Sequence, residues 1–204
     1  MVTDSPWAKQ AKVSIRGQID SSFDSRRGAG GAEDPNPVEA GAPIVVRWDS
    51  ALPVREACAA GGLERYLFSC YSKLLSLSDQ SRQFAELAKS FYIITVADFP
   101  GNMAPARARY APQHSDAANA ALTEMGQRLQ RGTALRRKGK DPFRPDRVLV
   151  LPAGRDFLVV AFFSRLEHIG PEEKTVTFEM DDGSIDIQAR FDLRKMSYKG
   201  TLAL

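Results

Sequence analysis

Residues 175–193 read TVTFEMDDGSIDIQARFDL, and this stretch decides the fold class. Apolar and polar side chains alternate on both sides of Asp182-Gly183, a residue pair typical of tight hairpin turns. If these two residues form the loop, the apolar members of both runs share one face. That register would pair Met180 with Ile185, Phe178 with Ile187, and Val176 with Ala189. The stretch therefore predicts an antiparallel sheet with one face on a core and the other in water.

Apolar periodicity elsewhere predicts further strands and helices around this hairpin. Strands are expected within residues 11–19, 44–48, 91–96, 148–151, 157–163 and 198–204, with 157–163 apolar on both faces as in a central strand. Helices are expected at 53–60, 63–75, 79–89 and 116–130. The expected inward residues of the last two helices are Phe84, Leu87, Ala88, Ala121, Leu122, Met125 and Leu129. The predicted class is α+β: a single domain whose carboxy-terminal antiparallel meander packs with three or four amphipathic helices.

Composition divides the chain into three parts. Residues 1–20 form an N-terminal segment that includes a short strand, residues 21–43 are a Gly- and Pro-rich linker or loop, and residues 44–204 are the compact domain. Mean hydropathy is −0.30 and hydrophobic residues make up 43%, which is ordinary for a soluble protein. No apolar run approaches the roughly 20 residues of a membrane-spanning helix, and the start has neither the basic nor the apolar region of a secretion signal.

Sequence motifs point to no particular reaction. The chain has no H-E-x-x-H, C-x-x-C or G-x-S-x-G pattern, and the basic residues after Gly132 do not have the spacing of a phosphate loop. Glu56, Asp98 and His168 are the candidates for a general base, and their spacing in the sequence favours none of them. We expect no catalytic residue and no cofactor.

Neither the acidic pairs nor the cysteines predict a metal site. The pairs at 172–173 and 181–182 each lie beside an expected turn, where Asp bonds to the local backbone and Glu is solvated. Cys58 and Cys70 fall within helix-patterned apolar surroundings, which favours two buried thiols, with a disulfide as the alternative in an oxidising compartment.

Charge is concentrated between residues 128 and 147. Two acidic residues, Asp141 and Asp146, oppose eight basic ones there, a local charge of +6 in a chain whose total is +3. The eight candidate binding residues are Arg128, Arg131, Arg136, Arg137, Lys138, Lys140, Arg144 and Arg147. Such a segment can meet phosphate, an acidic partner or an anionic surface. A solvated face is the favoured interpretation, because Phe143 is the only aromatic residue interleaved to stack on bases.

Three stretches together resemble a group of uncharacterised bacterial proteins of exported type. They are residues 3–9 (TDSPWAK) followed by the Gly-rich stretch, residues 46–57 (VRWDSALPVREA), and residues 191–200 (FDLRKMSYKG). The likeness spans most of the chain. It implies an envelope or extracytoplasmic setting, although the start carries no signal, and it supplies no activity and no catalytic residue.

We therefore expect a non-enzymatic interaction or scaffold module. Its contact surface would be the long loop at 99–115, a length more typical of functional than of neutral connections, together with segment 128–147. The expected partner is an unknown protein or an anionic surface. The alternative is a polyanion or nucleic-acid binder that uses segment 128–147, and the third hypothesis is an enzyme of unrecognised type.

Overall fold

A computed structural model describes residues 5–15, 43–61, 80–103, 105 and 115–204 of the chain. Several expectations fall outside these residues: the helix at 63–75, most of the linker at 21–43, Cys70, and most of the loop at 99–115. The side chain of Cys58 also lies outside the description. These expectations, and the domain boundaries drawn from them, stay predictions.

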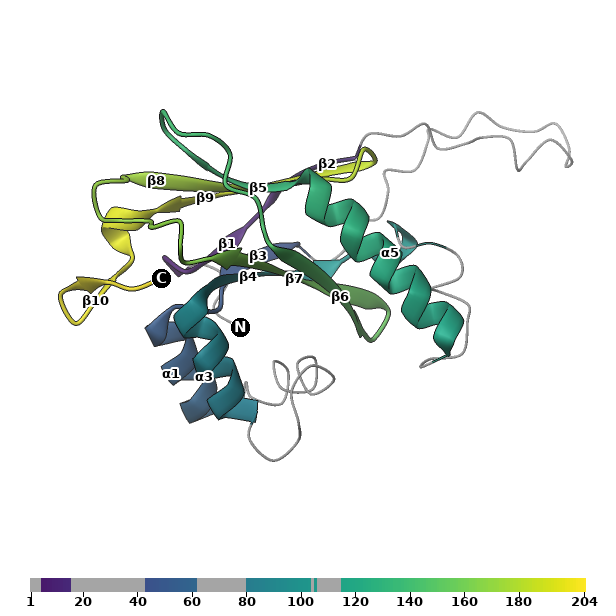
Figure 1. Ribbon diagram of the computed structural model, residues 1–204, viewed down its shortest axis with the longest axis horizontal. Coiled ribbons are helices and arrows are strands. Elements are labelled where there is room, and N and C mark those ends of the chain that lie inside the picture. The colour runs from purple at the N-terminus through teal and green to yellow at the C-terminus, as the bar shows by residue number, and fades with distance from the viewer. Residues whose placement is uncertain (1–4, 16–42, 62–79, 104, 106–114) are drawn as a thin grey trace, which may run out of the picture.

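Two antiparallel sheets form the body of the described structure (Figure 1). The five-stranded sheet has the order β1-β3-β4-β7-β6, and the four-stranded sheet has the order β2-β9-β8-β5. The first contains β1 (Ala8–Gln10), β3 (Val45–Trp48), β4 (Phe91–Phe99), β7 (Asp156–Ser164) and β6 (Arg147–Ala153). The second contains β2 (Lys12–Ile15), β9 (Ile185–Asp192), β8 (Thr175–Asp181) and β5 (Thr133–Arg137).

The main core lies between the two sheets. Alternation puts every second residue of β8 and β9 inward, and Phe178, Ile187 and Phe191 are fully buried. Trp48 on β3 meets Phe191 across the gap, with ring centroids 5.4 Å apart and nearly perpendicular planes. The two sheets are therefore held together by interdigitated apolar side chains, as in a sandwich.

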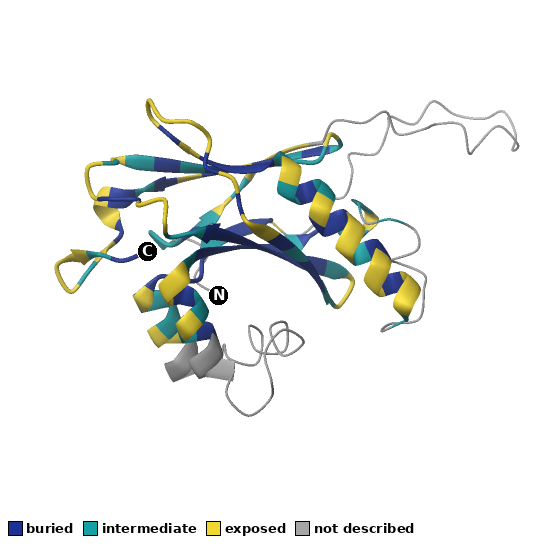
Figure 2. Cartoon of the chain, viewed as in Figure 1, coloured by how far each residue is buried: buried dark blue, intermediate teal, exposed yellow. Residues whose placement is uncertain are grey.

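Three helices cover the sheets in the described part of the chain. The first two, α1 (Leu52–Gly61) and α3 (Gln80–Ser90), lie on the outer face of the five-stranded sheet, where Phe84 and Ala88 join a second apolar cluster (Figures 1 and 2). The third, α5 (Asp116–Gly132), packs mainly on β6 and also on β8. None of these helices is long and apolar enough to cross a membrane.

A close approach fixes the junction of α5 with β5. A Cβ on Gly132 would lie only 1.5 Å from the carbonyl oxygen of Asp181, so this position requires glycine. At the other end of α5 the Ser115 side chain accepts a hydrogen bond from the Ala118 amide at 3.2 Å, as a helix N-cap does. The N-cap fixes where α5 begins, and the close approach at Gly132 lets the chain pass directly from α5 into β5, an edge strand of the four-stranded sheet.

The hairpin of β8 and β9 exists, but the predicted two-residue loop is wrong. Asp181 pairs with Asp186, so the loop has four residues and the register is shifted by two, pairing Met180 with Ile187 rather than Ile185. The cause is the Asp182 carboxylate, which accepts hydrogen bonds from the backbone amides of Ser184 and Ile185, both at 3.0 Å. Because a shift of two preserves side-chain alternation, the predicted inward faces are confirmed.

The predicted single carboxy-terminal meander is also wrong. The strands β6 and β7 belong to one sheet and β8 and β9 to the other, so the chain crosses between sheets after Ser164. The last two strands, β10 (Ser197–Tyr198) and β11 (Thr201–Leu202), form a separate hairpin. Local alternation could not show this, because strands of both sheets contribute inward faces to the same core.

Other strand and helix predictions are confirmed. The strand at 44–48 lies beside the one at 91–96, residues 157–163 are buried on both faces, and a strand occurs at 12–15. The helices expected at 53–60, 79–89 and 116–130 are α1, α3 and α5. The sequence did not predict β1 or β5.

Candidate functional site

The basic segment 128–147 is spread over four structural settings. Arg128 and Arg131 lie on α5, Arg136 and Arg137 on β5, and Arg147 begins β6. Between β5 and β6 an exposed turn at residues 138–142 carries Lys138 and Lys140. The prediction of a solvated face and loop is thus incomplete, because part of the segment is a strand within a sheet.

Two cations of this segment pair with acidic side chains of the β8–β9 hairpin. Arg128 lies 3.3 Å from Asp182, whose side chain is only 1% exposed, and Arg136 lies 2.6 Å from Glu179. Burial raises the pKa of Asp182, but the hydrogen bonds from Ser184 and Ile185 and the charge of Arg128 outweigh it, so the pKa lies below its ordinary value. These two pairs join the helix end and β5 to the neighbouring hairpin.

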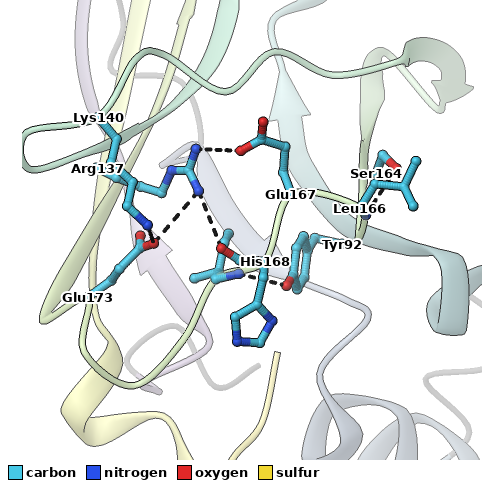
Figure 3. A network of polar contacts seen from close by, with 9 residues as sticks. Tyr92, Arg137, Lys140, Ser164, Leu166, Glu167, His168 and Glu173 are labelled. Atoms are coloured by element: carbon cyan, nitrogen blue, oxygen red, sulfur yellow. Dashed lines mark hydrogen bonds and ion pairs between the residues drawn. The ribbon is translucent and has the colours of Figure 1, made fainter.

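A buried network surrounds Arg137 (Figure 3). The guanidinium, 5% exposed, lies 2.8 Å from Glu167 and 3.7 Å from Glu173, and it donates to the His168 carbonyl at 3.4 Å. Lys140 lies 2.5 Å from the same Glu173, which is 7% exposed. The network ties the turn at 138–142 to the β7–β8 connection at residues 164–174. We call these two segments the two-loop surface.

The remaining four basic residues make no ion pair with an acidic side chain of the described residues. Arg144 donates to the Arg131 carbonyl at 2.5 Å, and the Arg147 guanidinium lies 4.4 Å from the centre of the Phe162 ring. Arg131, Lys138, Arg144 and Arg147 are all exposed. Four of the eight basic residues of the segment are therefore without an acidic partner in the described part of the chain.

Phe143, the aromatic residue of the segment, is not available for base stacking. It is 6% exposed, its ring lies 5.3 Å from that of Phe163, and the Arg137 guanidinium lies 5.3 Å from its centroid. Its backbone pairs with Leu135 of β5 in both directions, at 2.7 and 2.9 Å. Phe143 is thus a core residue that closes the turn at 138–142.

A half-buried guanidinium, that of Arg165, holds the other end of the 164–174 connection. Arg165 Nε donates to the carbonyls of Ala88 at 2.9 Å and Phe91 at 3.3 Å, and another of its nitrogens donates to Leu204. The same guanidinium lies 4.3 Å from the centre of the Tyr92 ring. Tyr92 in turn accepts a hydrogen bond from the Ile169 amide at 3.1 Å.

Between these two anchors, Leu166 is 96% exposed. Figure 3 shows its side chain apart from the contact between Glu167 and Arg137. The sequence analysis missed this residue. Its only signal was one apolar side chain between the polar residues Arg165 and Glu167, after the strand that ends at Ser164.

The three candidate general bases lie in different surroundings. Glu56 accepts from the Tyr198 hydroxyl, which lowers its pKa, and pairs with Lys199 at 3.3 Å. The His168 ring is exposed, and only its backbone carbonyl joins the Arg137 network.

Asp98 occupies a strained position near a second carboxylate. Its φ is 58° and it lies at a register shift in the pairing of β4 with β7. Burial raises the pKa of Asp98 above its ordinary value, and the nearby Asp156 raises it further. Asp156 itself accepts a hydrogen bond from the Gly101 amide at 3.1 Å. The described residues contain no cluster of three or more metal-binding side chains.

Comparison of the chain with protein-family models, curated proteins and solved structures found no match.

Proposed function

We propose that this chain is a non-enzymatic interaction module that binds a protein partner through the two-loop surface and the adjoining exposed cations. One observation carries the proposal: two loops, each of which connects one sheet to the other, are fastened together where Lys140 and the buried Arg137 both pair with the buried Glu173. A contact surface whose conformation is already fixed loses less entropy on binding than a mobile one. An envelope setting, implied by the resemblance to exported proteins, belongs to the same proposal.

Charge favours a protein partner over a nucleic acid. Four of the eight basic residues are engaged with Asp182, Glu179, Glu167 and Glu173, so only half of them remain to contact phosphates. With Phe143 buried, the segment also offers no aromatic platform for bases. The exposed Asp141 and Asp146 reduce the positive field further. A mixed, partly neutralised surface of this kind suits the polar rim of a protein interface.

Co-purification with the full tagged chain from its source organism tests this proposal. We compare the wild type with a variant carrying Lys138→Glu and Arg144→Glu, two exposed cations without an acidic partner. The matched control carries Lys12→Glu and Arg155→Glu, which change the same charge on the edge strand β2 and in the β6–β7 turn, the latter at the opposite end of β6 and β7 from the two loops. We expect one stoichiometric partner with the wild type and the control, reduced at least tenfold in the first variant. Equal recovery with both variants would contradict the proposal.

A salt titration tests the polyanion alternative directly. We expect a single-stranded DNA oligonucleotide to bind no more tightly than about 10⁻⁴ M at physiological salt, the weak end of non-specific association. Submicromolar binding that weakens steeply with salt, and that is lost on charge reversal at Arg131 and Arg144, would instead support the polyanion alternative.

A further inference from the structure

One extended segment, residues 5–15, forms an edge of both sheets. It contributes β1 to the five-stranded sheet and β2 to the four-stranded sheet, with only Ala11 between the two strands (Figure 1). Its first half pairs with β3 and its second half pairs with β9. Since β4 and β8 lie on the other sides of β3 and β9, this segment is the neighbour that covers the outer edge of each. We call residues 5–15 the shared strand.

The shared strand is held by backbone pairing more than by apolar burial. The Trp48 amide of β3 donates to the Trp7 carbonyl at 2.8 Å, and the Trp7 indole donates to the Ala203 carbonyl at 2.9 Å. Between residues 5 and 14, Ala8 is the only side chain that is buried. In β9, by contrast, every inward residue is buried. An element with few buried apolar contacts opens at a lower free-energy cost than the core does.

Detachment of the shared strand would leave an unpaired edge in each sheet. Unpaired backbone groups along a strand are a template for pairing with another extended segment. The strands behind these edges belong to the core, since Trp48 of β3 and Ile187 of β9 are fully buried. The structure itself shows which segment fits both edges at once, because residues 5–15 occupy them in register. A second copy of the chain carries the same segment and therefore meets the same geometric requirements.

Chain length permits this segment to reach a second copy. Residues 16–42 connect the shared strand to the body of the chain, and a connection of that length can reach at most about 90 Å. The diameter of a domain of this size is only roughly 40 Å. An exchanged strand makes the same contacts as the original, so these contacts cancel between monomer and dimer. The balance is then set by the effective concentration of the tethered strand, which is on the order of 1 mM.

We propose that two copies of this chain exchange their shared strands, so that each strand closes both sheets of the other copy. The exchanged dimer is a minor species at micromolar concentration and becomes substantial as the chain approaches the millimolar range. The exchange uses residues other than those of the two-loop surface. It therefore goes beyond the proposed function and does not depend on it.

Hydrogen exchange of the unmodified chain tests whether the shared strand detaches. The Trp48 amide bonds to the shared strand, whereas the next amide, that of Asp49, bonds to the Ile93 carbonyl of β4 at 2.8 Å. Both residues are buried, so the two amides form a matched pair. After correction for intrinsic rates, we expect the Trp48 amide to exchange at least tenfold faster. Equal protection of the two amides would overturn the exchange of strands, because the shared strand would then leave only on global unfolding.

Mixed disulfides test the exchange of strands itself. Gln188 of β9 lies directly opposite Lys12 of β2, and both residues are exposed. Opposite residues of antiparallel strands are within the separation that a disulfide spans. A full chain with Lys12→Cys is mixed with a full chain with Gln188→Cys at about 0.5 mM, close to the effective concentration above. Both chains carry alanine at positions 58 and 70, so that only the introduced thiols react.

The control mixture keeps the Gln188→Cys chain and changes only the other one. Glu179 of β8 also lies directly opposite Gln188, but a short turn joins β8 to β9, so these two strands cannot exchange without unfolding. We expect the Lys12→Cys mixture to form disulfide-linked dimer at least tenfold faster than the Glu179→Cys mixture. Equal rates would overturn the exchange and leave the proposed function standing. At low concentration, one chain with both Lys12→Cys and Gln188→Cys should close its own disulfide, and failure to do so would overturn the β2–β9 pairing on which the inference depends.

Discussion

Arg137→Met should destabilise the protein more than the same substitution at any other basic residue of segment 128–147. The Arg137 side chain is almost fully buried, and its loss leaves the 7%-exposed Glu173 with Lys140 as its one remaining cation. Methionine keeps similar length and volume, so the change removes charge and hydrogen bonds rather than packing. Breaking a buried ion pair by deleting one partner typically costs about 3 to 5 kcal/mol.

The lower end of that range applies here. Lys140 still lies 2.5 Å from Glu173 after the substitution, and the wild-type network is itself imperfect, because Arg137 Nε and Glu173 Oε2 are buried without a hydrogen-bond partner. We therefore expect a loss of about 3 kcal/mol in the free energy of unfolding. At a urea dependence of about 2 kcal/mol per molar, this lowers the unfolding midpoint by about 1.5 M.

The adjacent strand residue provides the matched control. Arg136 carries the same side chain and also pairs with a glutamate, but it is 56% exposed on the outer face of β5. Arg136→Met should cost less than about 1 kcal/mol, which is a midpoint shift of under about 0.5 M. Adding Glu173→Gln to Arg137→Met should cost less than the two single changes together, because it removes the uncompensated charge. Equal urea midpoints for Arg137→Met and Arg136→Met would refute the buried network.

Three further predictions follow from burial and from the pKa shifts. Phe178→Ala should lower the free energy of unfolding by about 3 to 5 kcal/mol and Glu179→Ala by less than about 1, and similar urea midpoints would contradict the inward face of β8. Asp98→Asn should raise the melting temperature at pH 7, since the raised pKa means that the charged form opposes folding. The gain in melting temperature should disappear below pH 3.8, the ordinary pKa of aspartate. Asparagine tolerates the positive φ of residue 98, so the substitution adds no backbone strain. Asp182→Asn should lower the free energy of unfolding at pH 7, because the lowered pKa of Asp182 means that its charged form stabilises the fold above pH 3.8. The difference in unfolding free energy between wild type and variant should shrink as the pH falls through the pKa of the folded state, and a constant difference would contradict the role of the Asp182 carboxylate.

Local sequence pattern determined which elements form and which faces they bury. The alternation of β8 and β9 and the 3.6-residue stripe of α5 depend on side chains a few residues apart, so both could be predicted from the chain. The sequence also showed that residues 157–163 are buried on both faces. It could not show the four-residue hairpin loop, because a shift of two residues preserves the alternation and only the hydrogen bonds of Asp182 decide between the registers.

Tertiary structure alone decided which strands belong to which sheet. It also decided which basic residues of segment 128–147 have acidic partners. The acidic partners of Arg128, Arg136, Arg137 and Lys140 lie between 30 and 54 residues further along the chain, so a local charge of +6 says nothing about how much of it is neutralised. The exposure of Leu166 has the same origin. It is one leucine in a polar connection, and the position of that connection depends on contacts of Arg165 with the distant Ala88 and Phe91 carbonyls.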